Sequence, residues 1–191
     1  MKKIRFFKQH TQETCGISCM MMVLDYFGID YPTVGKERRL YQIYGTRATA
    51  GTLGSAIAYG LFRRGLQVTL AHSSDKLMEN RDGYYPDKLY NEILEEYRTF
   101  IQRADGGFSL ETGVEINGDV LRQELMKDRL VILQCFVEGT ADGMHDHVLH
   151  GILLYDCDED HFYACDPICG KIQLADDEIE NCIETPVGRM Y

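Results

Sequence analysis

The chain has 191 residues, a formal net charge of −10 and an isoelectric point near 5.0. This acidity would repel phosphate backbones and anionic lipids, so it argues against nucleic acid and membrane surfaces as partners and favours a basic peptide. With 45% hydrophobic and 26% charged residues, the composition is typical of a globular protein. The length fits a single domain spanning residues 1–191.

The longest apolar runs are too short to span a bilayer, and the first residues, MKKIRFFKQH, lack the apolar stretch of a secretory signal. We therefore expect a cytoplasmic protein whose thiols stay reduced. The seven cysteines have no spacing typical of a disulfide framework. Most of them are predicted to be free and buried.

The first half of the chain is predicted to be mainly helical. Residues 15–27, CGISCMMMVLDYF, have apolar side chains at helical spacing, and Gly28 provides a left-handed stop. A second helix is expected to end at Gly65, with Thr49 or Thr52 as its cap. Further elements are expected as a strand over 66–71, an amphipathic helix from Tyr85, and a helix capped by Asn117 or Asp119.

After Arg129 the sequence changes to short segments rich in β-forming residues, separated by acidic or glycine turns. These segments are LVILQCF, HVLHGILLYD, HFYACD and KIQLA. Helices followed by an antiparallel sheet form an α+β pattern rather than an alternating βαβ one.

Cys15 opens the first predicted helix, where the helix dipole and unpaired backbone N–H groups favour a thiolate. Gly16 allows a backbone or a substrate to approach closely, and Gln9 can bring an amide near the thiol. This amide and the Cys15 N–H would form an oxyanion hole for an attacked carbonyl. The alternative interpretation is that Cys15 is a small buried hydrophobic residue.

A cysteine nucleophile also needs a base and a group that orients the base. The second half of the chain offers His145, His147, His150 and His161 together with several acids. An acid on a strand beside that of a histidine can meet it across the ladder.

The run from His150 to Pro167 resembles the histidine strand, turn and Asp-Pro of the papain-like double-glycine leader peptidases, a bacterial, bacteriocin-processing family with stand-alone relatives. In that family the Asp follows the histidine by sixteen positions, as Asp166 follows His150. Gln9, Cys15-Gly16 and an apolar helix ending in DYFG are similar to the family's first block. The segment GTLGSAIAYGLFRRGLQVTLA resembles its second helix and following strand.

The resemblance implies a papain-like α+β fold, with a helical N-terminal half packed on a C-terminal antiparallel sheet. It implies a cysteine peptidase without a cofactor, acting on a peptide or protein substrate. Gln9 would be the oxyanion donor, Cys15 the nucleophile, His150 the base and Asp166 its orienter. The alternatives are acyl transfer or peptide ligation by the same triad, a non-catalytic peptide-binding module, and a redox-sensing thiol that pairs with Cys19 or with another thiol.

Two features depart from the family pattern. Asp156 stands where a glycine commonly follows the family histidine by six positions, whereas Gly151 lies six positions after His145. His145 and His147 therefore remain open as the base, with His150 favoured. Residues 72–117 exceed what a minimal peptidase domain needs, and we interpret them as a helical insert or a lid.

Metal binding is the weaker hypothesis for the histidine cluster. His145, His147 and His150 could bind zinc with Cys157, but on a strand His150 would face away from His147. The acidic segment DCDED at 156–160 lacks the glycine and the terminal glutamate of a calcium loop, and predicts a hairpin turn instead. We therefore expect no metal site.

Overall fold

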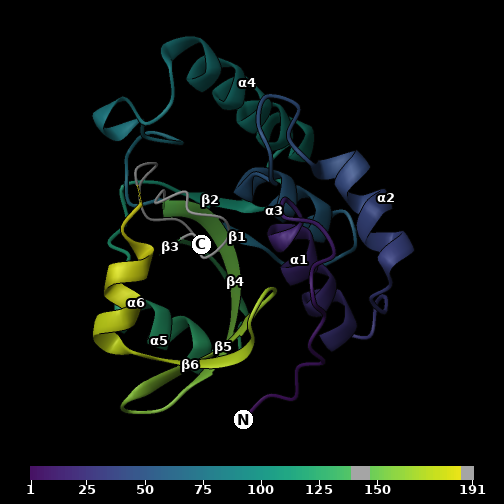
Figure 1. Ribbon diagram of the computed structural model, residues 1–191, viewed down its shortest axis with the longest axis vertical. Helices are drawn as coiled ribbons and strands as arrows, with labels where there is room; N and C mark the ends of the chain where they lie inside the picture. The colour runs from purple at the N-terminus through teal and green to yellow at the C-terminus, as the bar shows by residue number, and fades with distance from the viewer. Residues whose placement is uncertain (139–146, 186–191) are drawn as a thin grey trace.

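The computed structural model describes residues 1–138 and 147–185 of an α+β protein (Figure 1). The elements follow the order α1 (Cys15–Tyr26), α2 (Val34–Tyr44), α3 (Gly54–Phe62), β1 (Thr69–Ala71), the 3₁₀ turn η1 (Arg81–Gly83), α4 (Asp87–Ala104), β2 (Ser109–Glu111), α5 (Gly118–Met126), β3 (Val131–Glu138), β4 (His147–Cys157), β5 (His161–Asp166), β6 (Gly170–Ala175) and α6 (Asp176–Ile183).

The main sheet is antiparallel, with the strand order β3-β4-β5-β6. Strand β4 alternates between two apolar clusters, because Leu153 packs in the cluster around α1 and Leu154 packs in the cluster with α5 and α6. In Figure 1, α1 lies on one side of β4 and α5 and α6 lie on the other. A strand covered on both faces is expected to be a nearly continuous apolar run, as β4 is.

Helix α1 is enclosed by its neighbours, and all its residues from Gly16 to Leu24 are buried. A helix that is apolar all round is typical of a protein interior. It ends where the sequence predicts, because Gly28 adopts a φ of +68° and the Ile29 N–H donates to the Leu24 carbonyl at 2.9 Å.

Helices α2 and α3 pack on α1. The side chain of Thr33 caps α2 by accepting from the Lys36 N–H at 3.3 Å. The predicted caps of α3 are wrong, because Leu53 is its N-cap residue and no side chain caps the helix. Thr52 instead forms an isolated β-bridge with Gly45, so the chain is still extended at that point.

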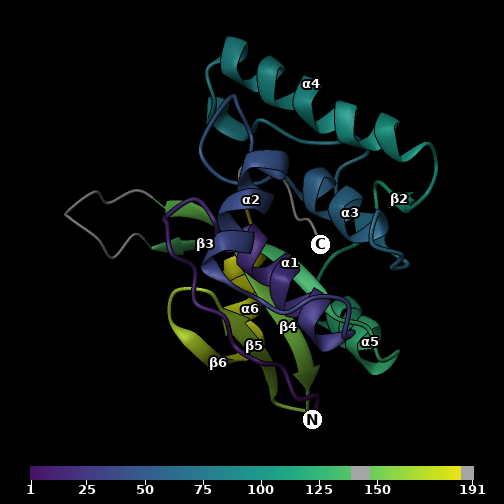
Figure 2. The ribbon, with the colours of Figure 1, turned by 90° about the vertical axis from the view of Figure 1, so that its right-hand side faces the viewer.

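Residues 72–117 contain a long helix, as predicted, and complete the helical layer. Helix α4 runs along the outer side of α3 in Figure 2 and packs against it. Strand β2 returns to pair in parallel with β1, with Leu70 opposite Leu110. The same segment therefore supplies both an outer helix and one strand of a small second sheet.

Several features differ from the prediction. Helices α2 and α6 lie where the sequence predicts none, and α6 follows the sheet rather than preceding it. All seven cysteines are free, as predicted, but only Cys19, Cys135 and Cys165 are buried. The prediction that most cysteines are buried is wrong because others lie near element ends, such as Cys169 in the turn between β5 and β6.

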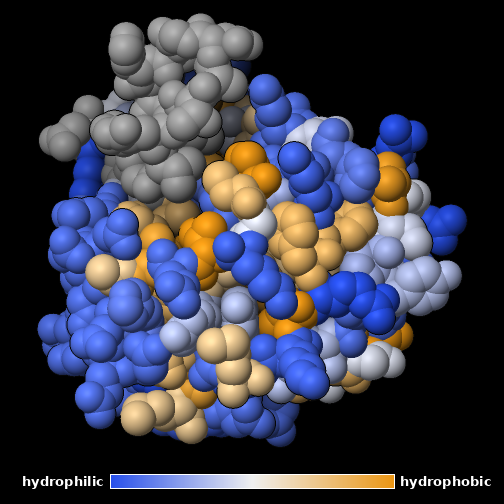
Figure 3. Space-filling view, turned by 60° about the horizontal axis from the view of Figure 1, so that its bottom comes forward, coloured by the Kyte–Doolittle hydropathy of each residue, from blue (hydrophilic) through white to orange (hydrophobic). Residues whose placement is uncertain are grey.

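Apolar side chains on the face shown in Figure 3 form patches separated by hydrophilic ones. The most exposed large apolar residues of the described chain are Met1 and Met126, at 80% and 81%. Scattered apolar residues of this kind are ordinary on protein surfaces. Among the helices of residues 1–138 and 147–185, none combines the length and apolar character needed to cross a lipid bilayer.

A buried hydrogen bond joins the end of β1 to α4. His72 Nε2 lies 2.8 Å from the Tyr97 hydroxyl, and the two residues are 2% and 1% exposed. Burial lowers the pKa of His72 to about 4, which means that the folded protein holds this ring neutral at physiological pH.

This pKa shift predicts an acid-sensitive contribution to stability. Because the folded pKa lies below the unfolded value of 6.5, the contribution is present above pH 6.5 and is lost as the pH falls towards 4. We expect the free energy of unfolding of the parent to fall across this range by about 3 kcal/mol more than that of His72→Asn. Urea denaturation at several pH values measures the difference, and parallel profiles would contradict the assignment.

Candidate active site

Cys15 is placed at the meeting of α1 with the sheet. It is the first residue of α1, and its sulfur accepts hydrogen bonds from the backbone N–H groups of Gly151 and Gly16. The two glycines face each other where helix and strand meet, and a Cβ added at Gly151 would lie at an ordinary contact distance of 3.5 Å from the Gly16 nitrogen. A Cβ added at Gly16 would lie 2.7 Å from the Ile57 side chain, so the close approach at Gly16 is made by this side chain.

His150 and Asp166 are brought together by neighbouring strands. His150 lies on β4, Asp166 ends β5, and the register pairs Leu153 with Cys165. The distance from His150 Nε2 to Asp166 Oδ1 is 3.1 Å, and both residues are buried. The same Oδ1 accepts from the N–H groups of Ile168 and Cys169, at 2.6 and 3.1 Å. The carboxylate is thus fixed by its own turn.

The Cys15 side chain is hydrogen-bonded to His150, which completes a chain of three residues from thiol to carboxylate. Because Nε2 faces Asp166, Nδ1 is the ring nitrogen left for the thiol. Cys15, His150 and Asp166 are therefore in contact in the order that the sequence predicts.

The pKa values of the three groups shift in the directions that favour a charged pair. Burial alone would raise the pKa of Cys15, but the hydrogen bond and charge of His150 and the two backbone N–H groups lower it overall. Burial would lower the pKa of His150, yet Asp166 and Cys15 raise it to about 9. Burial would raise the pKa of Asp166, but the bonds from His150, Ile168 and Cys169 lower it overall.

Gln9 lies beside this site, but its amide is bonded within its own loop. Its backbone N–H donates to the Pro167 carbonyl at 3.0 Å, which places it next to Asp166. Its Nε2 donates to the carbonyls of Thr11 and Gln12, at 2.8 and 3.3 Å. The prediction that this amide faces Cys15 remains open, because these bonds orient it within the segment just before α1.

The structure does not describe the side chains of the two alternative bases, His145 and His147. His145 lies outside the described residues. The backbone of His147 begins β4, and its side chain is also outside the description. Among the histidines whose side chains are described, His150 interacts with both the Cys15 thiol and the Asp166 carboxylate.

Cys19 lies one turn along α1 from Cys15, but its thiol donates to the Gly151 carbonyl at 3.4 Å. Burial raises the pKa of Cys19 well above its usual value, so this group stays protonated. A protonated, bonded thiol is a poor partner for a redox step at Cys15.

Metal-type side chains cluster elsewhere in the described part of the chain, at Asp158, Asp160 and His161 in the turn between β4 and β5. Asp158 accepts bonds there from the backbone of Asp160 and His161 and from the Tyr163 hydroxyl. These hydrogen bonds stabilise the turn between β4 and β5, so the acidic segment forms the hairpin turn that was predicted.

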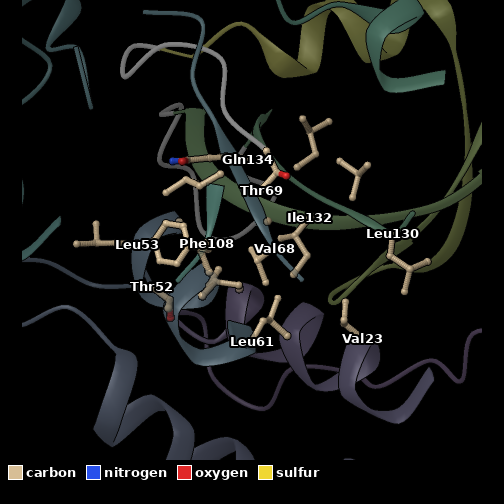
Figure 4. A pocket seen from close by; sticks show the side chains of 18 of the residues that line it. Val23, Thr52, Leu53, Leu61, Val68, Thr69, Phe108, Leu130, Ile132 and Gln134 are labelled. Carbon is tan, nitrogen blue, oxygen red and sulfur yellow. The ribbon is translucent and has the colours of Figure 1, made fainter. Parts of the chain in front are cut away.

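The site opens onto a cavity of about 840 Å³, which Cys15 and His150 help to line. Figure 4 shows its wall, in which apolar side chains from α1, α3 and the start of β3, including Val23, Leu61 and Ile132, point towards the same space. Residues of the segment 72–117, such as Phe108, also contribute to the wall. A large cavity that combines apolar side chains with polar groups is typical of a ligand site.

The structure also adds a polar group that the sequence analysis did not select. Glu37 on α2 is 1% exposed and accepts a hydrogen bond from the Thr14 hydroxyl, immediately before Cys15. A signal was present, because Glu37, Leu40 and Tyr44 have helical spacing and are the buried residues of α2. Helix α2 was not predicted because one of the three buried positions on its inner face is a glutamate and not an apolar residue.

Neither the models of known protein families nor the curated protein sequences contain a match to this chain. What the chain does must therefore be inferred from the geometry of this site.

The shifted pKa values predict that Cys15 reacts at unusually low pH. In iodoacetamide alkylation followed by mass spectrometry, we expect the Cys15 rate to have a midpoint below the ordinary thiol value of about 8.5. His150→Ala removes the largest stabilising contact, so its Cys15 midpoint should move towards the ordinary thiol value of about 8.5. A His150→Ala profile that matches the parent would contradict the pairing.

Proposed function

We propose that this protein is a cysteine peptidase-like hydrolase with a papain-like arrangement of helix and sheet, in which Cys15, His150 and Asp166 form the catalytic triad. The observation that carries the proposal is the continuous contact from the Cys15 thiol through the His150 ring to the Asp166 carboxylate, with 3.1 Å between Nε2 and Oδ1. The contact lies at the head of a buried helix and borders a large cavity. A residue used only for packing would need neither the ordered carboxylate nor the cavity.

The chemistry follows from the charges at the site. A thiolate at Cys15 attacks the carbonyl carbon of an amide, and the electrons of the C=O bond move to the oxygen. As the tetrahedral intermediate collapses, the C–N bond breaks and His150 donates its Nδ1 proton to the leaving amine. The neutral ring then takes a proton from water, the resulting hydroxide attacks the thioester, and the acid is released with the thiolate restored.

The oxyanion requires N–H donors that are free in the resting site or that exchange their partner when substrate binds. The Cys15 backbone N–H lies at the helix start, where such groups lack helical partners. Gln9 supplies the second donor in this proposal. Its weaker bond to the Gln12 carbonyl, at 3.3 Å, would be exchanged for the oxyanion when substrate binds, while the 2.8 Å bond to Thr11 holds the amide in place. Catalytic hydrogen bonds commonly tighten only when substrate is bound.

The substrate in this proposal is a peptide or protein. The cavity beside the triad has apolar side chains in its wall that can accommodate those of a peptide, and the net charge of −10 favours a basic chain. The resemblance to double-glycine leader peptidases adds that the scissile bond would follow a pair of small residues. An amine that enters in place of water would give acyl transfer or ligation through the same thioester.

Two alternative functions agree less well with the geometry of the site. A non-catalytic peptide-binding module would have no use for an ordered Asp166 or a raised pKa at His150. A redox-sensing thiol would need a partner for Cys15, but the Cys19 thiol is bonded to the Gly151 carbonyl and held protonated.

A peptide library tests the proposal. We expect the parent protein, incubated with a proteome-derived peptide library, to generate new N-termini that mass spectrometry can identify. Cys15→Ala and His150→Ala should generate none above the background of the library alone. New N-termini that persist in Cys15→Ala would contradict the assigned nucleophile, and binding without cleavage by the parent would support the binding module.

The role of Gln9 has a matched control in the same assay. Gln9→Ala should lower kcat/KM on a cleaved peptide by about 10²–10³, the cost of one oxyanion donor. Gln12→Ala alters an exposed glutamine three residues further along the same loop and should retain activity. Because the Gln9 amide acts on the oxyanion, Gln9→Ala should keep the Cys15 alkylation profile of the parent.

A further inference from the structure

Glu37 lies on α2, outside the triad, and its carboxylate is buried among polar groups. It is 1% exposed, and the hydroxyl-bearing residues around it, Thr14 and Ser18, are 2% and 0% exposed. Removing a carboxylate from water is costly unless it is well paired. A buried ion pair is weak evidence for stability, because apolar residues often replace one without loss. The role of Glu37 is therefore best inferred from where its hydrogen-bond partners lie in the chain, and not from how many there are.

The partners of Glu37 all belong to the segment that leads into Cys15 and to the first turns of α1. Oε1 accepts from the His10 backbone N–H at 2.9 Å, from the Thr14 hydroxyl at 2.6 Å and from the Ser18 hydroxyl at 3.4 Å. Oε2 lies 2.8 Å from His10 Nδ1. One side chain of α2 thus fixes positions 10, 14 and 18 at once.

These positions flank the groups of the proposed mechanism. His10 follows Gln9, and Thr14 precedes Cys15. The backbone carbonyl of Thr14 accepts the first hydrogen bond of α1, from the Ser18 N–H at 2.8 Å. The groups that hydrogen-bond the Cys15 sulfur are His150 and the N–H groups of Gly151 and Gly16. Glu37 therefore acts on the thiol through the placement of the backbone and not by direct contact.

We propose that Glu37 is a positioning residue: its buried carboxylate sets the path of residues 9–15, and thereby the position of Gln9 and of Cys15 against His150. The inference rests on the proposed function, because it assumes that the contact between Cys15 and His150 is the working one. It assigns to α2 a role in the site.

The test compares variants of Glu37 with a control on the same helix. Glu37→Leu keeps the size of the side chain but accepts no hydrogen bond, whereas Glu37→Gln keeps one acceptor oxygen. Leu40→Ala alters another buried residue of α2, which packs in the apolar cluster around α1 and not with residues 9–15. For each variant, urea denaturation measures stability and the pH profile of iodoacetamide alkylation measures the state of Cys15.

We expect Glu37→Leu to raise the Cys15 midpoint by about one pH unit, towards the ordinary thiol value of about 8.5. Glu37→Gln should keep a midpoint close to that of the parent, and Leu40→Ala should keep it despite a loss of stability. On a cleaved peptide, Glu37→Leu should lower kcat more than it raises KM. If Glu37→Leu does not fold, Thr14→Val, which removes one donor to the carboxylate, should shift the midpoint in the same direction by a smaller amount.

Two failures are distinguishable. A parent-like midpoint in Glu37→Leu, or in Thr14→Val where that variant replaces it, would overturn the positioning role and leave the triad intact. A shift of equal size in Leu40→Ala would also overturn it, because general loosening of α2 would then suffice. A parent midpoint that is already near 8.5 would contradict the proposed function, and the positioning role with it.

Discussion

The burial of α1 is the constraint on which the rest of the structure depends. Its residues from Gly16 to Leu24 all need cover, which β4 provides on one side and α2 and α3 provide on others. Enclosing the helix in this way fixes its axis, so its first residue has one position relative to the sheet. That residue is Cys15. It lies against Gly151 of β4, which directly follows His150.

The electrostatics of the site follow from this packing. Burial by itself would disfavour both the thiolate and the imidazolium. His150 and two backbone N–H groups favour the thiolate, and Asp166 and Cys15 together favour the imidazolium. The helix start contributes backbone N–H groups, and the β5 turn contributes an ordered carboxylate. Neighbouring α2 adds a second buried carboxylate, Glu37, whose partners hold the chain that enters the helix.

Much of the site could be predicted because its signals are local. Cys15 stands at the start of an apolar helix with a glycine stop, and the spacing from His150 to Asp166 matches two strands and a turn. The orientation of the Gln9 amide could not be predicted, because it depends on the carbonyls of Thr11 and Gln12 in an irregular loop.

The parts of the fold that the sequence analysis missed have related causes. Helix α2 was missed because its buried stripe is narrow and contains a glutamate. Helix α6 is short, and its first turn is wholly acidic, which suits a helix start but gives little apolar periodicity. The parallel pairing of β1 with β2 joins three-residue strands that are far apart in the sequence, and such pairs carry no local pattern.

The protonation state of His150 tests the account most directly. In protein labelled with ¹⁵N-histidine, and with the His150 signals assigned from His150→Gln, an NMR pH titration measures the pKa of this ring. We expect a pKa of about 9 in the parent and a lower value in Cys15→Ala, which loses the hydrogen bond and the charge of the thiolate. A His150 pKa near the ordinary 6.5 in both proteins would contradict the thiolate–imidazolium pair.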